Sequence, residues 1–219
     1  MLSAQEESLA KPFPVAIHFG RLPTRVNAER YCVLGIDPAA AGATGFGIVE
    51  REGNRCRTLR LGALRPAVPL ATLVNSHLCH IHSLIAALIQ EFQPRAVAIE
   101  SVFTALNVKA ALRLAEVRGV VLLAAAQAGV PSFSYSPREV KATVAGYGHA
   151  GKEQVQQMVR ALLSMTETPE PADAADALAL ALCHIQIAES KARLGASLHT
   201  EAAARRRNRA STSRILSVR

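Results

Sequence analysis

Three strand-like segments follow one another near the start of the chain and then give way to alternating helices and strands. The first three, at residues 31–36, 44–49 and 55–61, are short and apolar, with a Glu-Gly-Asn turn before the third. The spacing of apolar residues then predicts helices at 70–92, 105–128, 137–144, 152–163 and 173–189, and strands at 96–100 and 132–135. This order is typical of an α/β fold in which helices pack against one mixed sheet.

The two ends of the chain differ in composition from its middle. Residues 1–30 mix Pro, Glu, Arg and Asn without periodicity, which predicts a loosely ordered N-terminal extension before a folded domain at 31–190. Residues 191–219 hold eight Lys or Arg and one Glu, so they carry most of the net charge of +8 and predict a disordered basic tail. Such a tail fits either a nonspecific tether to nucleic acid or a solvated end without function.

Several classes of protein are excluded by the sequence. No apolar run approaches the ~18 residues of a membrane-spanning helix, and the first ten residues lack the pattern of a secretory signal. The four cysteines form no CxxC pair, so neither a disulfide framework nor a cysteine zinc cluster is supported. We therefore expect a cytoplasmic protein with no membrane partner.

Four carboxylates occupy positions at which functional sites commonly form. Asp37 and Glu100 each end an apolar strand, whereas Asp173 and Asp176 open a helix. Strand ends and helix starts often meet at one sheet edge, and converging carboxylates need cations to offset their repulsion. Paired Mg²⁺ ions among them would favour phosphodiester hydrolysis. A turn at Asp37 and capping of the helix by Asp173 and Asp176 are the alternatives.

The segments around these acids resemble the RuvC family of Holliday junction endonucleases between about residues 31 and 184. The matches, in order, are LGIDP (34–38), TGFG (44–47), IESVF (99–103), RG (118–119), PREVK (137–141), GYG (146–148), KEQV (152–155) and DAADALA (173–179). The resemblance implies a ribonuclease H-like fold, with a mixed five-stranded sheet and helices on both faces. It also implies a homodimer, which suits the two-fold symmetry of a four-way junction.

The resemblance implies a Mg²⁺-dependent enzyme that nicks four-way DNA junctions in pairs during recombination and repair, leaving 5′-phosphate and 3′-hydroxyl ends. Two Mg²⁺ ions per active site are expected, with Mn²⁺ as a substitute. Further expected partners include a branch-migration motor complex similar to RuvAB. The residues that match catalytic positions are Asp37, Glu100, Asp173 and Asp176 as metal ligands, and Lys141 and Lys152 beside the scissile phosphate.

The resemblance also assigns DNA contacts. Phe103 matches an aromatic residue that stacks on bases, and Asn107, Arg113 and Arg138 are further candidates beside the two lysines. Ordinary core packing for Phe103 and solvated positions for the basic residues are the alternatives.

One departure from the family pattern keeps other functions open. The turn after Asp37 contains Ala39–Ala43 and is one residue longer than the family's. A junction-binding accessory protein with weak or no cleavage therefore remains an alternative, as does a ribonuclease H-like nuclease for another structured nucleic acid.

Overall fold

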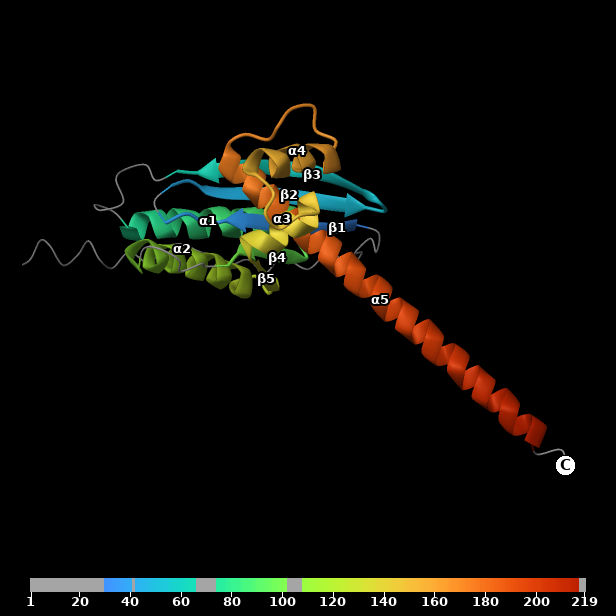
Figure 1. Cartoon of the computed structure of the whole chain (residues 1–219). Helices are drawn as coiled ribbons and strands as arrows, with labels where there is room; N and C mark the ends of the chain where they lie inside the picture. The colour runs from blue at the N-terminus through green and yellow to red at the C-terminus, as the bar shows by residue number, and fades with distance from the viewer. Residues whose placement is uncertain (1–29, 41, 66–73, 102–107, 217–219) are drawn as a thin grey trace, which may run out of the picture.

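The computed structural model describes residues 30–40, 42–65, 74–101 and 108–216, and its centre is a five-stranded mixed sheet (Figure 1). The strands are β1 (Arg30–Asp37), β2 (Thr44–Glu52), β3 (Arg55–Leu64), β4 (Ala96–Glu100) and β5 (Ser132–Tyr135). The helices are α1 (Val74–Phe92), α2 (Val108–Gln127), α3 (Pro137–Ala145), α4 (Lys152–Leu162) and α5 (Ala172–Leu216). Every predicted strand and helix is therefore present, and the bounds agree within a few residues except at the end of α5, which reaches Leu216 instead of residue 189.

The strands lie in the order β3-β2-β1-β4-β5. The first three follow one another in an antiparallel meander, whereas β4 runs parallel to both β1 and β5. The parallel strands need crossover helices, and α1 and α2 supply them. The predicted mixed sheet is confirmed.

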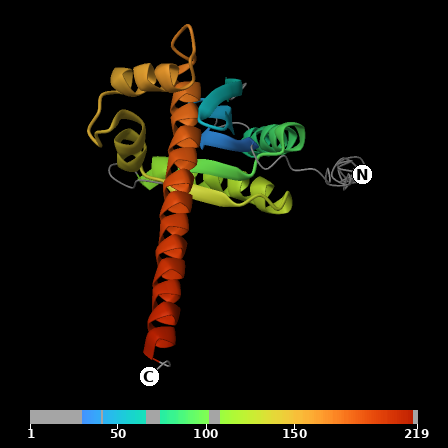
Figure 2. The same ribbon diagram turned by 90° about the vertical axis from the view of Figure 1, so that its right-hand side faces the viewer.

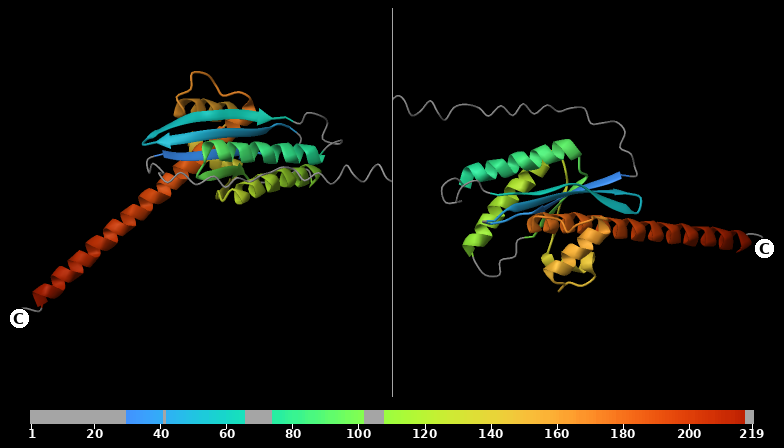
Figure 3. Two further views of the ribbon diagram at one scale, coloured as in Figure 1. Left: turned by 180° about the vertical axis from the view of Figure 1, so that it is seen from behind. Right: turned by 90° about the horizontal axis from the view of Figure 1, so that it is seen from above.

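Helices cover both faces of the sheet, as predicted (Figure 3). Side chains alternate along β1, so that Leu34 and Ile36 pack under α1 and α2 while Val33 packs under α5. β4 is buried on both sides over residues 96–99, which explains its continuous apolar sequence. Two apolar cores, one on each face, therefore hold the sheet in place.

A buried histidine fastens α5 to the central strand β1 and to the edge strand β5. The His184 ring lies within hydrogen-bond distance of the Tyr31 hydroxyl through Nε2 (2.8 Å) and of the Tyr135 hydroxyl through Nδ1 (2.7 Å). A neutral imidazole can donate from one nitrogen and accept at the other, so both contacts are satisfied without a charge. Burial lowers the pKa of His184, which favours this neutral form.

α5 continues as a helix to Leu216, well beyond the sheet (Figures 1 and 2). This differs from the disordered tail predicted for residues 191–219. The reason is composition, because Ala and Arg are both strong helix formers and the segment contains no Pro or Gly after Gly195. Residues 1–29 of the predicted N-terminal extension (1–30) lie outside the described residues, and Arg30 begins β1.

Within the described part of the chain, no helix combines the length and apolar character needed to cross a membrane.

Candidate functional site

Two carboxylates extend from neighbouring parallel strands on the same face of the sheet. Ile36 of β1 pairs with Ile99 of β4, so the next residues, Asp37 and Glu100, lie side by side. Side chains alternate along a strand, and both isoleucines face the α1 and α2 side. Asp37 and Glu100 therefore point to the opposite face, which α5 covers.

Two further carboxylates come from the first turn of α5, which lies almost against the sheet. Gly45 is the cross-strand partner of Asp37, and a Cβ atom built on it would be 2.0 Å from the backbone oxygen of Asp173. A Cβ on Gly35 would be 1.9 Å from the backbone oxygen of Ala177. Only glycine permits this approach. The two glycines thus bring Asp173 and Asp176 close to Asp37.

The two lysines come from α3 and α4. Ser136 caps α3 in a reciprocal capping box with Glu139, with Pro137 in the first turn, so the helix starts sharply and carries Lys141 toward the site. Lys152 begins α4, and its Nζ donates a 3.0 Å hydrogen bond to Oδ2 of Asp176. This ion pair links α4 to α5 across the site.

A cavity of about 230 Å³ opens between these elements. Its polar lining consists of Asp37, Glu100, Asp176, Lys141 and Lys152, and its apolar lining of Pro137, Val140, Val155, Ala179 and Leu180. A water molecule occupies roughly 30 Å³ of liquid, so the cavity has room for a phosphate group and several waters. Five of the six residues predicted as catalytic meet here, and Asp173 lies close enough for its charge to act on Asp37 and Lys152.

Burial and mutual repulsion shape the ionisation of the acids. Burial, followed by the negative charges of Glu100 and Asp176, raises the pKa of Asp37 to about 8. Burial also raises the pKa of Glu100, although the hydrogen bond from Asp37 opposes that rise. The pKa of Lys152 is raised by its hydrogen bond to Asp176, so this lysine stays charged. Without a cation, the acids therefore retain a proton between Asp37 and Glu100.

The donor set fits a divalent metal. Carboxylate oxygens are the ligands that Mg²⁺ prefers, and a cation in place of the retained proton would relieve the repulsion. Among the described residues, no three His, Cys, Asp or Glu side chains are already arranged around one point to hold an ion, and Asp176 is instead paired with Lys152. Metal binding at Asp37, Glu100 and Asp176 would thus require this ion pair to loosen.

The raised pKa of Asp37 predicts how pH affects the metal-free protein. The folded state holds a proton up to about pH 8 that the unfolded chain releases near its ordinary value of 3.8, so folding stability falls across that interval. Asp37→Asn cannot ionise and should raise the unfolding temperature in EDTA by several degrees at pH 8. The gain over wild type should grow steadily from pH 5 to pH 8 in thermal unfolding. A gain that is the same at every pH would contradict this explanation.

Of the remaining predicted DNA contacts, the two that the structure describes, Arg113 and Arg138, do not line the cavity. Arg138 is exposed in the first turn of α3 and packs against Gly148, whereas Arg113 lies on α2, which covers the opposite face of the sheet. Phe103 and Asn107 lie outside the described residues, as does Ala41 of the turn Ala39–Ala43. The sequence analysis missed the roles of Gly35 and Gly45. Glycine inside an apolar strand is the signal that would have found them, since it marks a close backbone approach.

Residues 33–184 match the family model described as crossover junction endodeoxyribonuclease RuvC. The RuvC protein of Desulfitobacterium hafniense is 45% identical over 166 residues, which cover 76% of this chain and 99% of that relative. The RuvC protein of Heliobacterium modesticaldum is 48% identical over 151 residues, which cover 69% of this chain and 91% of that relative.

Solved structures of RuvC proteins are also similar to this chain in fold. The structure of Thermus thermophilus RuvC matches with a TM-score of 0.68 and 36% identity, covering 73% of this chain and 96% of that one. The same protein in complex with a Holliday junction substrate matches with a TM-score of 0.69 and 36% identity, covering 74% and 96%. The predicted ribonuclease H-like class is confirmed.

Proposed function

The chain belongs to the RuvC family of crossover junction endodeoxyribonucleases, and we propose that it resolves four-way DNA junctions by paired, metal-dependent nicks. Such an enzyme acts in homologous recombination and DNA repair. The observation that carries the proposal is the cavity in which acids from two strands and one helix face two lysines. The proposed location is the cytoplasm, and a RuvAB-like branch-migration motor is the proposed supplier of junctions.

The acids would hold Mg²⁺, or Mn²⁺ in its place, at Asp37, Glu100, Asp173 and Asp176. When bound, a pair of such ions supplies an activated water and stabilises the leaving oxygen of a phosphodiester. The half-buried Asp37 and Glu100 are held by adjacent strands and need little rearrangement, which would keep the reacting groups in register. The products would carry 5′-phosphate and 3′-hydroxyl ends.

The lysines would bind the phosphate that is cut. Lys152 is more than half exposed, so its ammonium group can exchange Asp176 for a phosphate oxygen. Lys141 lines the same cavity from α3. Positive charge fixed at these two positions would stabilise the negative charge that accumulates as the phosphodiester is attacked. It would also position the DNA strand over the acids.

The test is cleavage of a synthetic four-way junction beside a linear duplex of the same sequence, a flap and an RNA–DNA hybrid, with Mg²⁺ or with EDTA. Symmetric nicks on the junction alone, dependent on Mg²⁺, are the expected result. Tight junction binding without nicks would instead favour an accessory protein. Preferential cleavage of the flap or the hybrid would reassign the substrate.

A homodimer is the proposed assembly, and the exposed face of α2 supports it. Val108, Leu112 and Leu123 are 78%, 62% and 53% exposed. Together with Gly119 they follow one stripe along the helix, at spacings of four, seven and four residues. No atom lies within 4 Å of a Cβ placed on Gly119, so a second helix can approach there. A two-fold pairing of this face would present two sites to a two-fold junction.

The dimer proposal predicts that Leu112→Glu gives a monomer, because a buried unpaired carboxylate in the stripe costs several kcal/mol. Size-exclusion chromatography with light scattering should show wild type at twice the mass of one chain and the variant at the mass of one. Leu194→Glu, at an equally exposed leucine on α5, is the matched control and should remain dimeric. A monomeric wild type, or a dimeric Leu112→Glu, would refute this interface.

A further inference from the structure

α5 leaves the domain at the end of the sheet opposite the cavity. The helix begins beside Asp37 and runs back along β1 and β2 until Glu189 forms an ion pair with Arg51 near the end of β2. About 20 Å of helix separate Asp176 from Glu189, at 1.5 Å per residue. Beyond that point residues 191–216, which we name the C-terminal arm, project from the domain as a helix (Figures 1 and 2).

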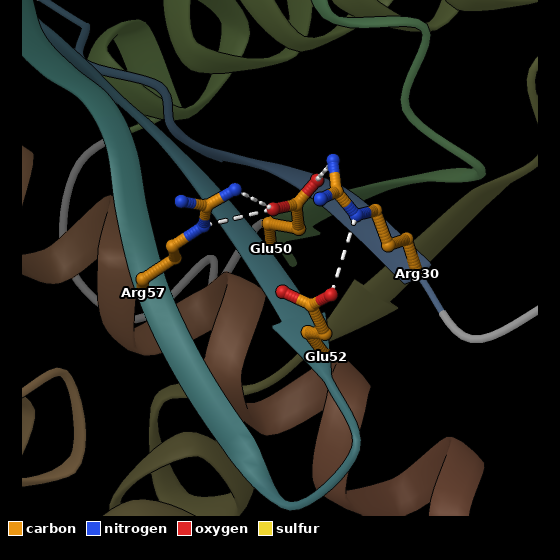
Figure 4. Close-up of polar contacts among 4 residues, drawn as sticks. All are labelled: Arg30, Glu50, Glu52 and Arg57. Atoms are coloured by element: carbon orange, nitrogen blue, oxygen red, sulfur yellow. Dashed lines mark hydrogen bonds and ion pairs between the residues drawn. The ribbon is translucent and has the colours of Figure 1, made fainter. Parts of the chain in front are cut away.

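The domain surface at the start of the C-terminal arm has its charges paired internally. Figure 4 shows buried Glu50 between two arginines: it accepts hydrogen bonds from Arg57 at 2.8 and 2.5 Å and lies 4.0 Å from Arg30. Arg30 also lies 3.6 Å from Glu52. Glu50 and Glu52 thus offset the charges of Arg30 and Arg57, and Glu189 offsets that of Arg51.

The C-terminal arm, in contrast, carries positive charge with little to offset it. Five arginines fall within ten residues, namely Arg205, Arg206, Arg207, Arg209 and Arg214, and Glu201 is the one acid of the segment. At 100° per residue these five positions fall within an arc of about 200° on an ideal helix, so they form one broad basic face. Like charges so close together repel one another, and a polyanion would remove this repulsion.

We propose that the C-terminal arm binds the phosphate backbone of duplex DNA outside the crossover. The position of the C-terminal arm relative to the cleaved phosphate rests on the proposed function. Arg205 and Arg214 lie about 44 and 57 Å along the helix from Asp176, at 1.5 Å per residue. A duplex that follows α5 away from the cavity would meet them roughly 13 to 17 base pairs from the cut, at 3.4 Å per base pair. The arm thereby lengthens the footprint of each protomer on a junction.

The test compares the full-length protein with two variants in which the five arginines become Gln or Lys. Gln and Lys are both good helix formers, so the variants differ in charge and not in helix propensity. Binding to a 25-base-pair linear duplex is measured by fluorescence anisotropy in EDTA at several salt concentrations, so the result does not depend on cleavage. Equal unfolding temperatures establish that each variant is folded.

The Gln variant should bind at least ~10-fold more weakly at about 100 mM salt, and its salt slope should fall by up to about 4.5, or 0.9 per lost phosphate contact. The Lys variant should keep most of the wild-type slope. An unchanged slope in the Gln variant would overturn the proposal and leave the charge to another partner, such as an acidic protein.

Four-way junctions whose duplexes differ in length locate the arginine contact along the DNA. With duplexes of 25 base pairs the Gln variant should bind more weakly than wild type, whereas with duplexes of 10 base pairs the two proteins should bind alike. An equal loss on both junctions would put the arginines at the crossover and would also refute the proposal. The proposed nuclease activity is tested by a separate result. It would be refuted if the wild-type protein made no Mg²⁺-dependent nicks.

Discussion

Replacing Asp37 by Asn should lower the rate of junction cleavage at least ~1000-fold, a loss of about 4 kcal/mol of transition-state stabilisation. The amide cannot carry the negative charge that a divalent cation requires, and Asp37 is the acid on which the charges of the other three act. Glu100→Gln should have a similar effect, because Glu100 lies beside Asp37 on β4. Junction binding in EDTA below about pH 8 should be close to that of wild type, since the metal-free pair of residues 37 and 100 carries one negative charge in both proteins.

Single-turnover cleavage at saturating protein separates this effect from changes in affinity. Glu91→Gln is the matched control, since Glu91 is an exposed acid on α1 that pairs with Arg60 at 2.9 Å. It should cleave at the wild-type rate. A fall of less than tenfold in folded Asp37→Asn protein would remove Asp37 from the proposed metal site.

Gly45→Ala should damage both folding and cleavage, although it adds one methyl group and no charge. The new Cβ would lie 2.0 Å from the backbone oxygen of Asp173, so the first turn of α5 must move away from the sheet. Overpacking of this kind costs about 1–3 kcal/mol of stability. A displacement of ~1 Å at Asp173 and Asp176 should lower the cleavage rate by about 100-fold.

Gly151→Ala is the control for this substitution. Gly151 precedes α4 with φ of −67°, and no atom lies within 4 Å of its Cβ position, so alanine fits there. Its unfolding temperature should stay near that of wild type, with a change in stability of about 0.5 kcal/mol or less. Wild-type cleavage by Gly45→Ala would show that the close approach of α5 does not position its acids.

The strand ends and the placement of the acids were predictable because they depend on local patterns. An apolar run that ends in a carboxylate, as at Asp37 and Glu100, predicts a buried strand. The charged residue at its end predicts a functional site at that edge of the sheet. The capping sequence at Ser136 likewise sets the start of α3 through contacts within four residues. Such signals are short in range, so one sequence contains them completely.

The rest of the site depends on contacts between distant segments. Nothing near Lys152 in the sequence indicates that its ammonium group meets Asp176, and the separation of Arg113 from the cavity follows from which face α2 covers. The packing of α5 against Gly45 is also long-range, although glycine inside a strand gives a hint. For the C-terminal arm, the charge pattern suggested a disordered tail, whereas helix propensity agreed with the helix that is observed.

The order in which the acids occur along the chain bears on its synthesis. Asp37 lies in the first strand of the described structure and Asp176 in the last helix, and α5 cannot dock until residues as far as His184 and Glu189 are available to hold it. A growing chain therefore has no complete site until α5 has been synthesised and has packed on the sheet. A product that terminates before α5 would lack Asp173 and Asp176 altogether. We therefore expect a chain that stops before α5 to lack cleavage activity.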